Sequence, residues 1–268
     1  MVELYDIYLY CVQYDKEIKY RGFGEIIMFD ILKKTKTYKT NITLQQLGLF
    51  DQFDRNVALI LKNKSIDIDG AIHMCVTQGA FEKKVINLKK DDDKAEYEMV
   101  QVVLGMALDN VIQQEEYRAL IIHGLLDNEI VIQKEDLMEL KDVVDSFCIM
   151  YAAARNKLPN EKAYEFMKGK TVYVFGNLPN INMKKGMEIK IPVIKRESER
   201  GQYESVKCFL TLESAEKFND TKEKVSAVNV QDLVKFYNNV FGVIIEPHRN
   251  YWIEFNADNA KLINKKNN

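Results

Sequence analysis

Proline is absent from the first 158 residues of this chain of 268 residues. All four prolines come later, at Pro159, Pro179, Pro192 and Pro247. Because its ring fixes φ and removes the N–H donor, proline is tolerated mainly at turns, sheet edges and first helical turns. The asymmetry therefore predicts two domains of different architecture, residues 1–157 and 158–268, and the length is sufficient for two cores.

The chain also lacks long apolar runs and a strong net charge. No run approaches the roughly 20 residues that cross a bilayer, and Glu3 and Asp6 interrupt any signal peptide. The formal net charge of −2 gives no electrostatic reason to expect a nucleic acid or an anionic membrane as partner. These features predict a cytoplasmic protein that binds neither.

Cysteine and histidine are few and widely spaced. None of Cys11, Cys75, Cys148 and Cys208 forms a C-x-x-C pair, and all lie in apolar segments, which favours free buried thiols. No pair of histidines has the spacing of a zinc site. Neither a Walker A motif nor a complete dinucleotide fingerprint is present. We therefore expect no cofactor and no metal.

Residues 1–157 are predicted to mix strands and helices, without a recognisable repeat. The predicted strands are 5–14, 72–76, 84–88, 120–123 and 129–133, and 24–33 is either a strand or a short helix. The predicted helices run from Thr43 through Ile60, from Asp91 through Val111 and from Asp136 to Ala154.

Residues 158–268 are predicted to form a small mixed sheet flanked by helices. A helix at 161–168 precedes a strand at 171–175, and 187–210 reads as a long hairpin. A helix beginning at Thr211, a strand at 224–228, a helix at 230–237 and a strand at 242–245 follow. This β-α-β-α-β run favours parallel pairing, so the fold class is α+β or mixed α/β.

The second domain resembles the SseB-like family of bacteria over about residues 160–264. The resemblance is carried by "VYV" at 172–174, by "CFLTLESAEKF" at 208–218 and by "GVIIEP" at 242–247. Within these, the matching positions are Phe209, Thr211, Glu213, Ala215, Phe218, Gly242 and Pro247. Leu210 and Glu246 depart from the residues usual in the family. The resemblance implies a bacterial, cytoplasmic α/β domain that engages other proteins, and it brings no catalytic residues.

Two groups of residues are candidate sites. Arg249, Tyr251 and Trp252 could form an interface hot spot, although core packing is the preferred interpretation of Trp252. His123, beside a glycine at a strand end, and the acids Asp91–Asp93 could serve an enzyme. A packed histidine and a helix start that uses the acids to stabilise its dipole are preferred.

The expected function is therefore that of a non-enzymatic interaction or regulatory protein whose partner is another protein. The first alternative is a hydrolase-like enzyme with a site around His123 and Asp91–Asp93. The second is an immunity- or phage-linked inhibitor, which is also a binding function.

Overall fold

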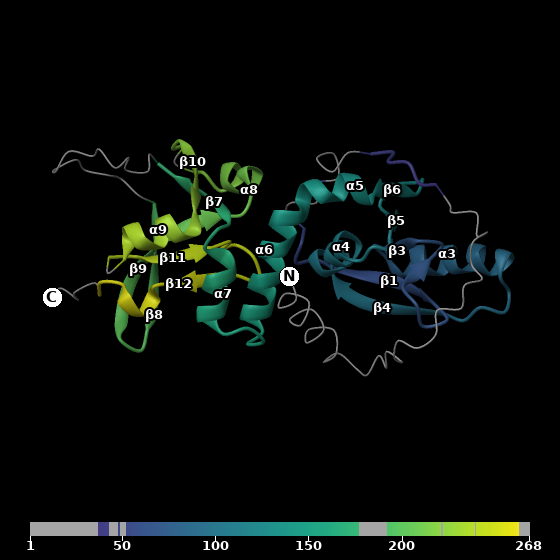
Figure 1. Cartoon of the computed structure of the whole chain (residues 1–268), viewed down its shortest axis with the longest axis horizontal. Coiled ribbons are helices and arrows are strands. Elements are labelled where there is room, and N and C mark those ends of the chain that lie inside the picture. Colours follow the sequence, from purple (N-terminus) through teal and green to yellow (C-terminus); the bar gives the residue numbers. More distant parts are fainter. Residues whose placement is uncertain are drawn as a thin grey trace. The chain divides into compact units, whose positions relative to one another are not determined.

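The computed structural model describes residues 37–42, 48, 52–176, 192–220, 222–238 and 240–262. The chain divides into two compact units, Met1–Val144 (unit 1) and Asp145–Asn268 (unit 2) (Figure 1). Each contains one sheet with helices, so the predicted mixture of α and β structure is confirmed. A division into independent domains at 157/158 stays a prediction.

Unit 1 is built on a six-stranded sheet of order β4-β1-β3-β5-β6, with β2 pairing β3. Strands β3 and β5 are parallel, and the other neighbours are antiparallel. Its elements are β1 (Asn56–Lys62), β2 (Asp67–Ile68), β3 (Ala71–Cys75), α3 (Gln78–Asp91), β4 (Tyr97–Val103), α4 (Leu104–Gln113), β5 (Ala119–His123), β6 (Ile130–Gln133), α5 (Lys134–Leu137) and η2 (Met138–Leu140). Helix α6 (Lys141–Ala154) then contains the division between the units.

Unit 2 is built on a six-stranded sheet of order β10-β7-β9-β11-β12, with β8 pairing β9. Strands β9 and β11 are parallel, and the other neighbours are antiparallel. Its elements are α7 (Asn160–Met167), β7 (Thr171–Phe175), β8 (Val193–Ser198), β9 (Gly201–Phe209), α8 (Leu212–Lys217), β10 (Val225–Asn229), α9 (Val230–Tyr237), β11 (Gly242–Ile245), β12 (Ile253–Phe255) and η3 (Ala257–Asn259).

The two units have the same topology. Strands β1 to β6 correspond in chain order to β7 to β12, and helices α3 and α4 correspond to α8 and α9. The strand order and the direction of every pairing agree. The expectation that residues 1–157 contain no repeat concerned the first domain alone, and the repeat of topology between the two units was not predicted.

The correspondence extends to single residues. Thr77 precedes α3 and Thr211 precedes α8, and each hydroxyl accepts the N–H of the third residue onward, Ala80 or Ser214. Such caps fix where a helix begins. Aligning the two threonines and the strand registers gives the equivalent positions Ala71 and Ser205, Ala119 and Gly242, His123 and Glu246, and Val131 and Glu254.

Helices cover both faces of the sheet in unit 2. On one face, Ala215 of α8 packs with Phe175 and Phe209. On the other, burial and the neighbouring Cys208 thiol raise the pKa of Tyr237 in α9 to about 12. Because side chains alternate along a strand, Cys208 and Phe209 face opposite helices. This explains the uncharged sequence of β11, all of which is buried.

Several predicted elements are confirmed, and the hairpin of β8 and β9 is present over the described residues. The predicted parallel pairing holds for β9 and β11, whereas β10 pairs antiparallel with β7 at the edge of the sheet.

Three predicted elements of unit 1 differ from the structure. Residues 84–88 belong to α3 instead of a strand, because the cap at Thr77 begins a helix whose Phe81, Val85 and Leu88 pack on the sheet at helical spacing. Residues 97–103 form β4, and the helix expected to begin at Asp91 begins only at Leu104.

The predicted helix through Ile60 is also wrong at its end, because Val57 and Ile60 lie in β1. The predicted elements at 5–14 and 24–33, Cys11, and the first part of the hairpin at 187–191 lie outside the described residues. Within the described part of the chain, every helix is too short or too polar to traverse a bilayer.

Candidate functional site

The three residues predicted as an interface lie in the connection between β11 and β12, and only one is well exposed. The side chain of Arg249 is 6% exposed, and its Nε donates to Glu246 Oε2 at 2.9 Å. Glu246 is fully buried and also accepts from Leu210 N at 2.7 Å and Ser214 Oγ at 3.2 Å. This buried carboxylate is thus fully hydrogen-bonded, and Arg249 serves the core of unit 2.

Tyr251 also packs within unit 2. Its ring meets that of Tyr151 edge-on at 4.7 Å between centroids, and that of Phe147 at 6.3 Å. Both partners lie on α6. Edge-to-face pairs of this kind stabilise packing, so Tyr251 attaches α6 to unit 2.

Trp252, in contrast, is 38% exposed, so the preferred interpretation of core packing is wrong. The guanidinium carbon of Arg196, on β8, lies 4.6 Å from its ring centroid. This is cation–π geometry. We call this pair, the exposed Trp252 and the half-buried Arg196, the Arg–Trp patch.

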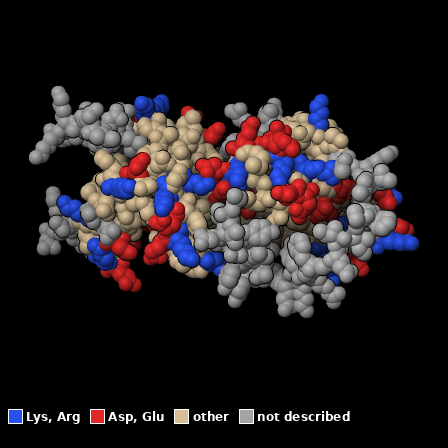
Figure 2. Space-filling view, viewed as in Figure 1, with Lys and Arg blue, Asp and Glu red and all other residues tan. Residues whose placement is uncertain are grey.

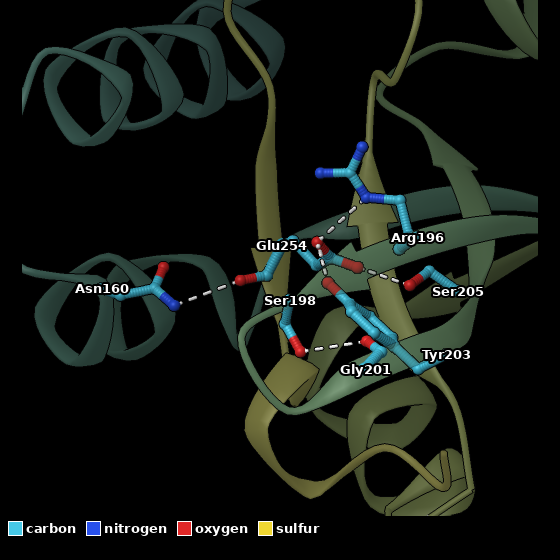
Figure 3. Close-up of polar contacts among 7 residues, drawn as sticks. All are labelled: Asn160, Arg196, Ser198, Gly201, Tyr203, Ser205 and Glu254. Carbon is cyan, nitrogen blue, oxygen red and sulfur yellow. Dashed lines mark hydrogen bonds and ion pairs between the residues drawn. The ribbon is translucent and has the colours of Figure 1, made fainter. Parts of the chain in front are cut away.

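Arg196 of the Arg–Trp patch belongs to a polar network around Glu254 (Figure 3). Glu254 Oε2 accepts from Arg196 Nε at 3.4 Å and from Tyr203 Oη at 3.0 Å. Its other oxygen accepts from the hydroxyl of Ser205. The Glu254 side chain is only 7% exposed, and its backbone carbonyl accepts from Asn160 Nδ2 at 3.1 Å. Three donors, one on β8 and two on β9, therefore hold the carboxylate that β12 carries.

The electrostatics keep this network intact. Burial raises the pKa of Tyr203, and the adjacent Glu254 carboxylate raises it further. The phenol therefore keeps its proton and donates it. The close approach also requires Gly242, because a Cβ there would lie 2.5 Å from Ser205 Oγ and 2.8 Å from Glu254 Oε1.

The equivalent positions of unit 1 are apolar. Ala71, Ala119 and Val131 stand where unit 2 has Ser205, Gly242 and Glu254. They pack in one hydrophobic cluster together with Tyr38 and Ile121. The shared topology therefore also accommodates apolar side chains at the positions equivalent to Ser205, Gly242 and Glu254.

Unit 1 has a different polar group, at the carboxyl end of its parallel strands. His73 Nδ1 lies 2.9 Å from His123 Nε2, and the rings stack at 5.1 Å between centroids. His123 Nδ1 lies 3.5 Å from Glu129 Oε1, which also pairs with Lys84 Nζ at 2.6 Å. Burial, and then Lys84, lower the pKa of His123 to about 4, so the imidazole is neutral.

The acids named with His123 lie elsewhere. His123 is near the start of α3, since a Cβ on the following Gly124 would lie 2.5 Å from Ala80 Cβ. Asp91 is the last residue of α3, and Asp92 pairs with Lys62 at 2.9 Å. A helix of 14 residues is about 20 Å long, so the structure does not bring these groups together. The acids end a helix, contrary to the interpretation as a helix start.

Among the described residues, no three histidine, cysteine, aspartate or glutamate side chains converge as metal ligands. Cys75 and Cys208 are buried free thiols. Burial raises the pKa of Cys75 to about 11, which keeps that thiol protonated and unreactive.

Comparison of the chain with protein-family models, with curated proteins and with solved structures gives no match.

Sequence reasoning identified Trp252 and missed the residues that hold it. Arg196, Tyr203 and Glu254 come from three strands, and 58 positions separate Arg196 from Glu254. One signal was available: Glu254 is a charged residue between two apolar ones, Ile253 and Phe255, in a short strand. Alternation then places its side chain on the face opposite to theirs.

Proposed function

We propose that the protein is a non-enzymatic interaction or regulatory protein that binds another protein through the Arg–Trp patch of unit 2. The observation that carries the proposal is the exposed Trp252 with the Arg196 guanidinium stacked on it. Tryptophan and arginine are the residues most often found to dominate the energy of protein interfaces.

The charge distribution supports a protein partner. Lysine and arginine are interspersed with aspartate and glutamate on the face drawn in Figure 2, in keeping with a net charge of −2. A surface of mixed sign offers no broad field for a polyanion. We therefore propose that the protein does not bind nucleic acid and that it is cytoplasmic.

The resemblance of unit 2 to the SseB-like family agrees with this role. Thr211 caps α8, Phe218 packs beside Phe209, and Gly242 begins β11, so the matching residues support the fold around the patch. An immunity- or phage-linked inhibitor is a narrower form of the same function, which the identity of the partner would distinguish.

Affinity capture tests the proposal. The full chain is immobilised and incubated with lysate of its source organism, and the same is done with Trp252→Ala and Phe236→Ala. Phe236 is a matched control, because it is an aromatic residue of unit 2 that is 48% exposed on α9. We expect a protein retained by the wild type and by Phe236→Ala but lost with Trp252→Ala. Retention by all three would overturn the proposed surface.

A further inference from the structure

We infer that the Arg–Trp patch recognises a carboxylate in an acidic segment of the partner protein, with Arg196 as the residue that binds it. This inference rests on the proposed function and adds the chemistry of the partner. It follows from the unused donors of Arg196, from the network that holds it and from a comparison of the two units.

Arg196 has more N–H donors than its contact with Glu254 uses. A guanidinium carries five N–H groups in a fixed plane; in the described structure the Nε of Arg196 donates to Glu254, and the Tyr203 hydroxyl is a further neighbour. Figure 3 shows the two terminal nitrogens directed away from Glu254. The side chain is 29% exposed. Two parallel N–H groups of one guanidinium match the two oxygens of a carboxylate.

The network fixes the position of Arg196 before any partner arrives. The Glu254 carboxylate is held in place, because Tyr203 and Ser205 donate to its two oxygens. It also packs closely against Gly242, where even a Cβ would not fit. The ring of Trp252 holds the guanidinium by a cation–π contact. An arginine that is already ordered loses less side-chain entropy on binding, which favours affinity.

Unit 1 shows that the fold does not require this network. The same topology is filled there by Ala71, Ala119 and Val131. Burying a carboxylate is no route to stability by itself, since its desolvation can exceed the gain from its partners. The polar network of unit 2 is therefore explained by the residue that it positions, the partly exposed Arg196.

The occupant is a protein segment because the patch combines two kinds of surface. Trp252 offers an apolar ring, and Arg196 offers two N–H groups at its side. Glu254 is buried behind the guanidinium, so little of its negative charge faces the partner. An aspartate or glutamate next to an apolar residue, or an apolar residue that ends a chain, satisfies both surfaces at once.

Selection of peptides from a random display library tests the inference. The full chain is the bait, and clones that also bind Trp252→Ala are removed, so that the retained peptides bind at the patch and their dependence on Arg196 stays open to test. Selected peptides are synthesised, together with versions in which Asp and Glu are replaced by Asn and Gln. Because Trp252 is the only tryptophan of the chain, its fluorescence reports binding at this place directly.

We expect peptides enriched in acidic residues or in free carboxyl ends, which change the emission of Trp252 in a saturable manner. Binding should weaken about tenfold or more for Arg196→Gln and for the neutralised peptides, the loss of one charge-assisted pair. Arg196→Lys should restore part of it, because lysine keeps the charge and loses the planar pair of donors. Thermal melts of both variants verify that they are folded.

Three outcomes would overturn the inference: recovery of no peptide, peptides without acidic groups, or equal binding to Arg196→Gln. Competition by inorganic phosphate as strong as by the peptides would assign the patch to phosphate groups instead. If affinity capture still depends on Trp252 in any of these cases, the proposed function stands and only the chemistry of the partner is wrong.

Discussion

At the scale of single residues, position 242 of unit 2 requires glycine because there is no room for a side chain. The glycine at 242 needs no unusual φ. It is needed because Ser205 and Glu254 occupy the volume of a side chain at this point. Gly79, on α3, is the opposite case, since a Cβ there would meet nothing within 4 Å. These two glycines provide a matched pair for experiment.

We expect Gly242→Ala to destabilise the protein by about 1–3 kcal/mol, the range for overpacking, and to displace Glu254 from its partners. Gly79→Ala, the control, should be neutral or stabilising by up to about 1 kcal/mol, because alanine favours a helix. Ser205→Ala removes the nearest atom, so its effect should not add to that of Gly242→Ala. Urea melts of these three variants and of the double variant Ser205→Ala/Gly242→Ala measure the effects, and simple additivity would show that the contact at Ser205 is not the cause.

His123 should make stability depend on pH. Its pKa is about 4 in the folded chain, owing to burial and Lys84 and against the pull of Glu129, and about 6.5 when unfolded. Between these values the unfolded chain binds more protons, so stability falls as pH is lowered. The contribution is complete above pH 6.5 and amounts to about 3 kcal/mol at most.

Urea melts at pH 7.5 and 4.5 on the wild type and on His123→Gln measure this contribution. The glutamine variant should lose less stability between the two values, since it has no proton to gain. Equal losses in the two proteins would contradict a buried neutral imidazole.

Thr211 and Phe218 give a third prediction at this scale. Loss of the hydroxyl that caps α8 should cost about 1 kcal/mol. Phe218 is half-buried and stacks on His248 at 3.8 Å between centroids, so Phe218→Ala should cost more, toward the lower end of the roughly 3–5 kcal/mol for a buried aromatic. Denaturant melts of the full chain compare them. Equal small losses would show that Phe218 does not support the core.

At the scale of elements, the sequence predicted best where a local signal was sufficient. The apolar run of β7, the cap of α8 and the helical spacing of the apolar residues in α9 all act within a few residues. Residues 84–88, KVINL, satisfy strand and helix patterns alike. The packing of Val85 and Leu88 on β1 and β3 decides between them, and that contact is not visible in the sequence.

The extent of unit 2 is testable at this scale. A fragment of residues 141–268 retains Phe147 and Tyr151, which pack on Tyr251, and Asp145, which lies 3.6 Å from Lys170 Nζ. A fragment of residues 158–268 loses all three. We expect the longer fragment to be more stable by about 2 kcal/mol or more, because a buried aromatic is lost from the shorter one.

Chemical denaturation, followed by Trp252 emission and circular dichroism, compares the two fragments. Equal stability would support a boundary at 157/158 and would show that α6 does not belong to unit 2.

At the scale of the whole molecule, the repeated topology is what the sequence could not show. The two units differ in residue type even at equivalent positions of the sheet, such as His123 and Glu246. A repeat can be recognised in a sequence only when equivalent positions keep the same residue types. The same topology requires only the same pattern of buried residues and the same helix caps. The site was hidden for a related reason, because its residues converge through strand pairing over about 50 positions or more.

The differences between the units have a consequence for folding from the denatured chain. A polypeptide that encodes one topology twice can pair a strand with the wrong copy, and such misassembly is a known failure of repeat proteins. Strand β12 in place of β6 would bury Glu254 against Ala119 and Tyr38, without Tyr203 or Ser205 to receive it. A buried carboxylate without hydrogen-bond donors would destabilise that mispaired state. The network that positions Arg196 therefore also helps each unit to pair with its own strands.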